Sequence, residues 1–252
     1  MRFVRFAIGS TIGYGLLEDD GRIRAISSTP FLPWEPTDER FEASQVRVLA
    51  PVLPSKVVAV GLNYRSHAEE TNKPLPEEPM LFIKPSTSVV GPEETIYLPA
   101  QSSRVDHEGE LAIVIGKAAR NVGDVTAAEA ILGYTCANDV TARDLQAKDV
   151  QFTRAKGFDT FCPLGPHVVT GLDPSNLELT CRVNGEVRQK SSTSDLVFAP
   201  AALVAFVSSV MTLLPGDVIL TGTPAGISAL HDGDVVEVEI SGIGVLRNPV
   251  SA

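Results

Sequence analysis

A short apolar run that directly follows two glutamates sets the strongest limit on the fold. Residues 111–115 are all apolar and stop at Gly116, which is typical of a buried β-strand. Because side chains at i and i+2 of a strand point to the same face, Glu108 and Glu110 project together, with only Gly109 between them. Two such carboxylates repel each other unless a positive charge joins them. The segment therefore indicates either a cation site or an exposed strand end whose carboxylates are solvated.

Strands also dominate the rest of the chain. An Asp-Gly turn predicts a hairpin of 12–17 with 23–26, and Asn184-Gly185 predicts one of 179–183 with 186–189. Apolar or alternating segments predict further strands, at 56–60, 81–83, 134–140 and 235–240. The chain is thus expected to be mainly β, in a mixed α+β fold.

Helices are expected to be fewer and short. A capping box of Thr126 with Glu129 predicts one helix, for which Gly133 suits the end. Pro200 fits the first turn of another. The apolar positions of this second helix are expected on one face, at Leu203, Phe206, Val207 and Val210.

The first fifty residues differ in character from the rest. They contain the first hairpin, a Pro-rich stretch at 30–36 and a polar segment, and Pro51 and Pro54 mark a boundary. We expect a small N-terminal extension domain, residues 1–51, and a main domain, residues 52–252.

Composition excludes several classes of function. The chain has 31 acidic and 21 basic residues, a net charge of -10 and no basic run, which argues against a nucleic-acid partner. Its longest apolar run, near 199–207, is too short to cross a bilayer. The start of the chain lacks a signal-peptide segment. Three scattered cysteines, Cys136, Cys162 and Cys181, favour small buried thiols and a cytoplasmic location.

A third acidic residue lies where a strand meets a helix. Residues 134–140 are expected to form a strand that ends in a polar pair, Asn138 and Asp139, and a capping-box pattern begins directly after it at Thr141. Three carboxylates suit Mg²⁺ or Mn²⁺, with the remaining positions open to water and substrate oxygens. Spacing alone does not bring Asp139 beside Glu108, so this cluster is a hypothesis.

A histidine and a glutamate form the third element. If a short helix begins at Asn63 or Ser66, His67 and Glu70 are neighbours at i and i+3. A carboxylate beside an imidazole fixes its tautomer and raises its basicity, which makes a general base. The alternative is an ordinary His–Glu pair on the protein surface.

Other motifs carry less chemistry. The segment 222–226 is Gly-rich but lacks the lysine and spacing of a phosphate loop, so a turn is expected. His167 and His231 are expected on the surface or in loops. Asp106 and His107 either support the orientation of the neighbouring glutamates or are plain strand-end residues.

Six segments, in this order, resemble the fumarylacetoacetate hydrolase superfamily. They are 61–70, 82–86, 107–111, 138–144, 155–159 and 220–224. The resemblance covers about residues 52–250, and the first fifty residues resemble the small extension of many short bacterial members. It implies a mixed β-roll that encloses a divalent-cation site, and a homodimer.

The resemblance also implies roles for single residues. The positions that match metal ligands are Glu108, Glu110 and Asp139, for Mg²⁺ or Mn²⁺. The positions that match a water-activating dyad on a lid are His67 and Glu70. The positions that match contacts to substrate are Arg143, Gln146 and Lys156, with Thr223 as a loop hydroxyl that binds a carboxylate.

Three functions are compatible with these residues. The first is metal-dependent hydrolysis of a carbon–carbon bond in an acylpyruvate-type 2,4-dioxo acid, which the presence of both His67 and Glu70 favours. The second is decarboxylation of oxaloacetate, or isomerisation or decarboxylation of 2-hydroxyhepta-2,4-diene-1,7-dioate in aromatic breakdown. The third is a non-catalytic module that binds a metal and a 2-oxo acid, which the retention of Lys156 with the other site residues disfavours.

Overall fold

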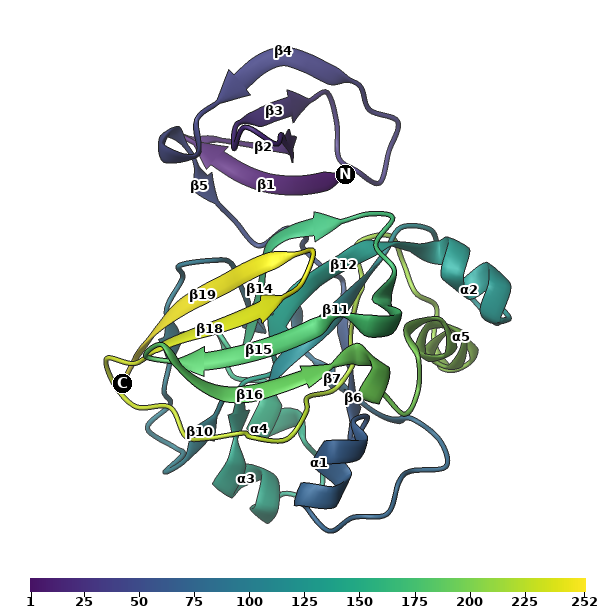
Figure 1. The fold of residues 1–252 in the computed structure, drawn as a ribbon, viewed down its shortest axis with the longest axis vertical. Coiled ribbons are helices and arrows are strands. Elements are labelled where there is room, and N and C mark those ends of the chain that lie inside the picture. Colours follow the sequence, from purple (N-terminus) through teal and green to yellow (C-terminus); the bar gives the residue numbers. More distant parts are fainter.

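The computed structural model describes residues 1–252 and has two large β-sheets and one two-stranded sheet, with short helices at their margins (Figure 1). The five α-helices are α1 (Arg65–Glu70), α2 (Asp124–Ala130), α3 (Arg143–Lys148), α4 (Thr153–Lys156) and α5 (Pro200–Val210). The predicted fold class, mainly β with mixed α+β content, is confirmed. No helix combines the length and apolar character needed to cross a bilayer.

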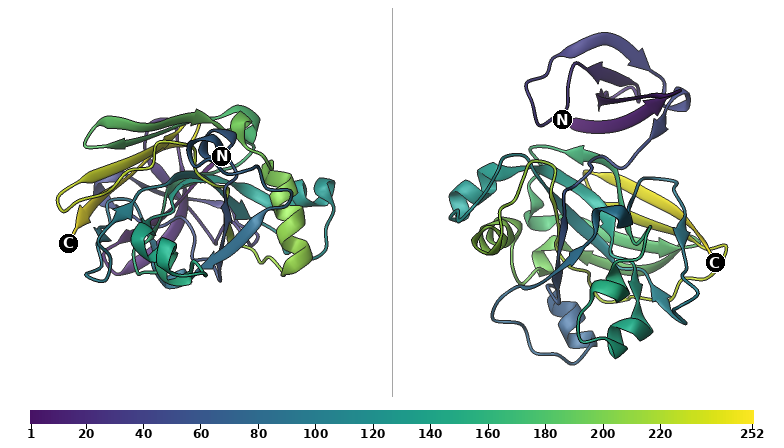
Figure 2. Two further views of the ribbon diagram at one scale, coloured as in Figure 1. Left: turned by 90° about the horizontal axis from the view of Figure 1, so that it is seen from below. Right: turned by 180° about the vertical axis from the view of Figure 1, so that it is seen from behind.

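The N-terminal segment forms a small antiparallel unit above the rest of the molecule (Figures 1 and 2). Its strands are β1 (Arg2–Ile8), β2 (Thr11–Leu17), β3 (Ile23–Ile26), β4 (Pro36–Phe41) and β5 (Arg47–Val48). A small apolar core of Val4, Phe6, Ile23 and Ala25 holds this unit together. Because β1 pairs with β14 of the main part, the unit extends the main sheet.

The main sheet is twelve-stranded, with the central order β1-β14-β12-β11-β17-β6-β7. Its strands beyond the N-terminal unit are β6 (Val57–Gly61), β7 (Met80–Lys84), β8 (Val89–Val90), β11 (Gly109–Ile115), β12 (Ile131–Asn138), β14 (Cys162–Val169) and β17 (Val218–Leu220). Strand β11 is buried at every residue, because Leu111 and Ile113 pack into one core cluster and Ala112 and Val114 into another. A strand covered on both faces reads as a continuous apolar run.

The second sheet has five strands in the order β16-β15-β18-β19-β9. They are β9 (Ile96–Tyr97), β15 (Glu178–Val183), β16 (Glu186–Ser192), β18 (Val235–Ile240) and β19 (Gly244–Ser251). A separate pair consists of β10 (Val105–Asp106) and β13 (Thr141–Ala142). The hairpin predicted at Asn184-Gly185 joins β15 to β16, and both turn residues have positive φ, as a type I′ turn requires.

The capping box predicted at Thr126 is wrong. The N-cap of α2 is Gly123, three residues before Thr126, and Gly133 lies inside β12 rather than at a helix end. The reason for a glycine at 133 is strand packing, because a Cβ there would lie 2.2 Å from the carbonyl oxygen of Val169 on β14.

Helix α5 begins at Pro200 as predicted, but its buried face differs from the predicted one. Leu203 and Val207 are buried together with Val204, whereas Val210 ends the helix and is 55% exposed. His167 was expected near the surface and is instead buried in β14, where burial lowers its pKa to about 4. His231 is exposed, as expected.

Candidate metal centre and active site

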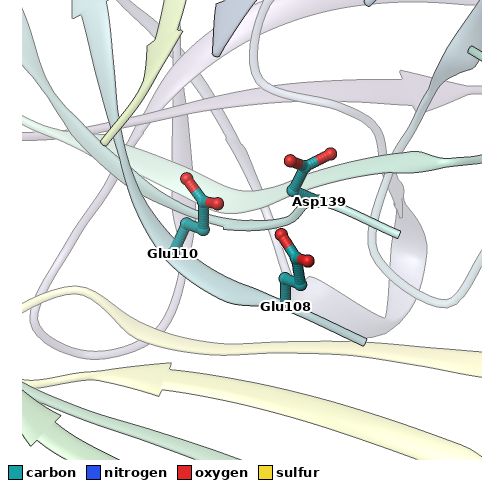
Figure 3. Close-up of side chains that lie close together, drawn as sticks. All are labelled: Glu108, Glu110 and Asp139. Carbon is teal, nitrogen blue, oxygen red and sulfur yellow. The ribbon is translucent and has the colours of Figure 1, made fainter. Parts of the chain in front are cut away.

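Three buried carboxylates converge where β11 begins and β12 ends (Figure 3). Strands β11 and β12 pair antiparallel with Gly109 opposite Asn138, so Asp139, just after β12, lies beside Glu108, just before β11. The Asp139 N–H donates to the Glu108 carbonyl oxygen over 2.9 Å. One ligand oxygen from each of Glu108, Glu110 and Asp139 lies within 4.8 Å of the others. This strand pairing supplies the juxtaposition that spacing alone did not establish.

The polar residues around Asp139 differ from the predicted capping pattern. Thr141 belongs to β13 and its hydroxyl donates to the Asp139 carbonyl oxygen over 2.8 Å, so it does not cap a helix. Helix α3 begins after Ala142 without a side-chain cap. This hydrogen bond instead holds the Asp139 backbone in place just after the end of β12.

Two buried lysines neutralise part of the carboxylate cluster. Lys156, on α4, donates from Nζ to Glu108 Oε2 over 2.8 Å and to Asp139 Oδ2 over 2.6 Å. Lys84, at the end of β7, donates to Asp139 Oδ1 over 2.5 Å and is fully buried. Sequence reasoning assigned no role to Lys84, because a lysine before a proline gives no sign that it faces a carboxylate 55 residues away.

Arg143 donates hydrogen bonds to three side chains of the protein. It donates to Glu108 Oε1 over 2.5 Å, to Asp106 Oδ2 over 3.0 Å and to Gln146 Oε1 over 2.7 Å. Asp106 is completely buried and also accepts from Arg104. Because Arg143 contacts both Asp106 and Glu108, the geometry favours a role for Asp106 in orienting Glu108 over that of a plain strand-end residue. The Nε2 donors of Gln146 have no partner in the protein.

The two glutamates of the cluster differ in charge environment. Burial opposes ionisation of Glu108, but the positive charges of Lys156 and Arg143 lower its pKa to about 2. Burial, together with the charges of Asp139 and Glu108, raises the pKa of Glu110 well above its ordinary value. Glu110 forms no ion pair and receives one hydrogen bond, from the Gly222 N–H over 2.6 Å. A buried carboxylate of this kind is stable when protonated or when a cation binds it, so these residues fit a metal of hard character.

The predicted His–Glu pair exists and lies on a short helix. His67 Nδ1 is 3.1 Å from Glu70 Oε2 on α1, so a neutral imidazole that donates to Glu70 leaves Nε2 as its acceptor. Glu70 Oε1 also accepts from the Gly226 N–H over 3.0 Å. The helix begins at Arg65, and neither Asn63 nor Ser66 caps it. Instead, Asn63 is buried and bonds to Phe198 and Thr221, and Ser66 bonds to Asp195.

One cavity of ≈ 380 Å³ contains nearly all predicted site residues. Those that line it are His67, Glu108, Glu110, Asp139, Arg143, Gln146, Lys156 and Thr223. Glu70 does not line it and reaches it through His67. Apolar side chains, among them Met80, Phe82 and Phe152, form the rest of the wall. The cavity thus combines a carboxylate cluster, an imidazole and an apolar wall.

The hydroxyl of Thr223 is already engaged within the protein. It donates to the Gly109 carbonyl oxygen over 2.9 Å and accepts from Gln189 Nε2 over 2.8 Å. A substrate carboxylate would compete with Gly109 for this proton, so the proposed contact to substrate stays a prediction. Gln189 itself carried no signal in the sequence, because it stands between Arg188 and Lys190 in a polar strand.

Comparison with known proteins adds independent information. Residues 56–251 match the family described as "Fumarylacetoacetate (FAA) hydrolase C-terminal", and residues 1–51 match "Rv2993c-like, N-terminal". A mitochondrial oxaloacetate tautomerase of Homo sapiens is 47% identical over 234 residues, which cover 88% of this chain and 72% of that protein.

Two solved structures resemble the whole chain. A 5-carboxymethyl-2-hydroxymuconate delta-isomerase from Mycobacterium smegmatis has a TM-score of 0.94 and 51% identity to this chain. The match covers 100% of this chain and 99% of that protein. A 2-hydroxyhepta-2,4-diene-1,7-dioate isomerase from Mycobacterium marinum has a TM-score of 0.92 and 47% identity, with coverage of 100% and 98%.

Proposed function

Because the chain belongs to the fumarylacetoacetate hydrolase family, we propose that it is a metal-dependent tautomerase or isomerase that moves a proton next to the carbonyl group of a small 2-oxo acid. The observation that carries this proposal is that the carboxylate cluster and the His67 imidazole line the same cavity. The similarity to an oxaloacetate tautomerase and to two isomerases supports the same class of reaction.

The cation site would consist of Glu108, Glu110 and Asp139. Mg²⁺ or Mn²⁺ held there would supply positive charge beside the carboxylate and keto oxygens of the acid, which makes the adjacent C–H more acidic. The proposal rests on the donor set, which is all oxygen, and on the buried Glu110, which has no cation partner among the side chains.

The residues of the chain would divide the remaining work. His67, with Nδ1 held by Glu70, presents Nε2 to accept or return the proton at carbon. Lys156 keeps a positive charge between Glu108 and Asp139, because their charges outweigh the cost of its burial and raise its pKa. Phe82 and Phe152 form an apolar wall that limits access of water to the reacting carbon.

Hydrolysis of an acylpyruvate is the second candidate, and one observation favours it. An imidazole oriented by a carboxylate is also what activation of a water molecule requires, and His67 with Glu70 has this geometry. Decarboxylation of oxaloacetate needs only stabilisation of the enolate and would depend less on His67. A non-catalytic binding module would not require the oriented imidazole at all.

Assays of one variant with several substrates separate these functions. We expect Mg²⁺- or Mn²⁺-loaded enzyme to accelerate ketonisation of enol-oxaloacetate or isomerisation of a hydroxymuconate analogue. His67→Ala should lose about a hundredfold to ten-thousandfold of that rate. It should still bind oxalate, because the carboxylate cluster is unchanged. Each rate is compared with the rate of the same reaction in the same cation without enzyme.

His231→Ala is the matched control. His231 also has a carboxylate at i+3, Asp234, with 3.6 Å between Nδ1 and Oδ2, but it is exposed and outside the cavity. This variant should retain the wild-type rate. If wild-type enzyme cleaves acetylpyruvate efficiently and accelerates neither proton-transfer reaction, the hydrolase replaces the tautomerase. If it turns over none of these substrates, the binding module is favoured.

A further inference from the structure

Gln189 occupies an unusual position in the second sheet. Strand β16 lies at the edge of that sheet, and Gln189 is its one buried residue, with no exposed surface. The pairing of β15 with β16 shifts between Cys181–Gln189 and Arg182–Val187, which leaves Arg188 as an extra residue. Such a bulge changes the direction of a side chain, and here the side chain is directed toward the start of β11.

The Gln189 amide joins two segments that line the cavity. Its Oε1 accepts from the Gly109 N–H over 2.9 Å, at the residue between the two glutamates. Its Nε2 donates to Thr223 Oγ1 and to the Pro224 carbonyl oxygen, each over 2.8 Å. A Cβ on Gly109 would lie 3.3 Å from Gln189 Oε1, so the backbone rests closely against this amide. Gln189 itself does not line the cavity.

We propose that Gln189 is a positioning residue that sets the geometry of the cation site. It holds the backbone from which Glu108 and Glu110 project, and it fixes the loop that carries Thr223. Mutation of a residue that orients metal ligands without touching the metal typically lowers metal affinity about 10- to 100-fold. This inference rests on the cation site of the proposed function.

A purely structural role for Gln189 makes a different prediction. In that case the amide only satisfies buried polar groups of the backbone and of neighbouring side chains, and its loss lowers stability without a particular effect on the cation. Asn248, on β19 of the same sheet, provides the matched control. Its buried amide donates to the carbonyl oxygens of Gly91 and Glu94, over 2.9 Å and 2.8 Å, and it does not line the cavity.

The test measures the dissociation constant of Mn²⁺ by calorimetry on chelator-treated protein, together with the melting temperature without cation. Gln189→Met removes the amide at similar volume, and Gln189→Asn is a milder change that withdraws it by one methylene. Both should raise the dissociation constant about 10- to 100-fold. Asn248→Leu should lower the melting temperature and change the dissociation constant by less than about twofold.

Three results would overturn the inference. One is a dissociation constant of Gln189→Asn within about twofold of wild type. Another is an equal loss of affinity in Asn248→Leu. The third is failure of both Gln189 variants to fold while Asn248→Leu folds, which would assign the amide to the stability of the fold. Wild-type protein that binds no Mn²⁺ would instead refute the cation site itself, and this inference with it.

Discussion

Glu108 and Glu110 show how the same side chain acquires different properties two residues apart. Lys156 and Arg143 pair with Glu108, whereas Glu110 faces two carboxylates with only a backbone N–H as a partner. Without a cation, the burial and repulsion that raise the pKa of Glu110 therefore make its ionised form unfavourable. The contribution of Glu110 to the free energy of unfolding should therefore fall as pH rises from the pKa of this group in the unfolded chain toward its higher pKa in the folded protein. A bound cation should reverse that effect.

Neutral replacements of the two glutamates should consequently have opposite effects on the cation-free protein. Glu110→Gln removes a repelled charge and keeps an acceptor for the Gly222 N–H, so its melting temperature at neutral pH should equal or exceed that of wild type. Glu108→Gln leaves Lys156 and Arg143 with less compensation and should melt lower. Both variants should lose most of the stabilisation that added Mg²⁺ or Mn²⁺ gives. Thermal melts in chelator and in excess cation measure this, and a lower melting temperature of cation-free Glu110→Gln would contradict it.

Among the single residues, those whose relative placement depends on spacing within one segment could be predicted from the sequence. The i, i+2 spacing correctly placed Glu108 and Glu110 together, and the i, i+3 spacing correctly paired His67 with Glu70. Lys84 was missed because its partner is brought in by strand pairing, and Gln189 because a bulge decides its direction. The catalytic and binding roles of all these residues stay predictions.

At the scale of elements, strands were predicted more accurately than helix ends. The continuous apolar run of β11 and the alternation in β18 follow directly from which faces are buried. Capping motifs are less specific, since Ser, Thr, Asp and Glu are common in any polar segment. Helix α2 illustrates this, because Gly123 precedes it with extended backbone angles and no side-chain cap.

A substitution of Gly123 should strengthen the N-terminal cap of α2. Gly123 has φ -82° and ψ 169°, and a Cβ there would meet nothing within 4 Å. Gly123→Ser should therefore add a side-chain acceptor and restrict the unfolded chain, which raises the free energy of unfolding by about 0.5–1 kcal/mol. Gly133→Ala is the contrasting variant and should lower it, because its Cβ would contact the Val169 carbonyl oxygen at 2.2 Å. Urea unfolding measures both changes, and a loss of stability in Gly123→Ser would show that the cap is misassigned.

At the scale of the whole molecule, composition and periodicity indicated a mainly β protein, but not how its strands are ordered. The main sheet places β17 between β11 and β6, and β14 between β1 and β12. These neighbours are far apart in the chain, so no local pattern determines them. The site depends on this order, because it brings residues of α1, β7 and α4 to one cavity. The homodimer stays a prediction.

We expect turnover of a 2-oxo acid to depend on a divalent cation held by the carboxylate cluster. The most direct test of this dependence is the rate of enol-oxaloacetate ketonisation by wild-type enzyme that has been stripped with chelator and then titrated with Mg²⁺ or Mn²⁺. We expect the stripped enzyme to be inactive and the added cation to restore the rate, with no recovery in Glu110→Gln at the same concentration. Full turnover by the metal-free enzyme would contradict a role for the cation in the reaction.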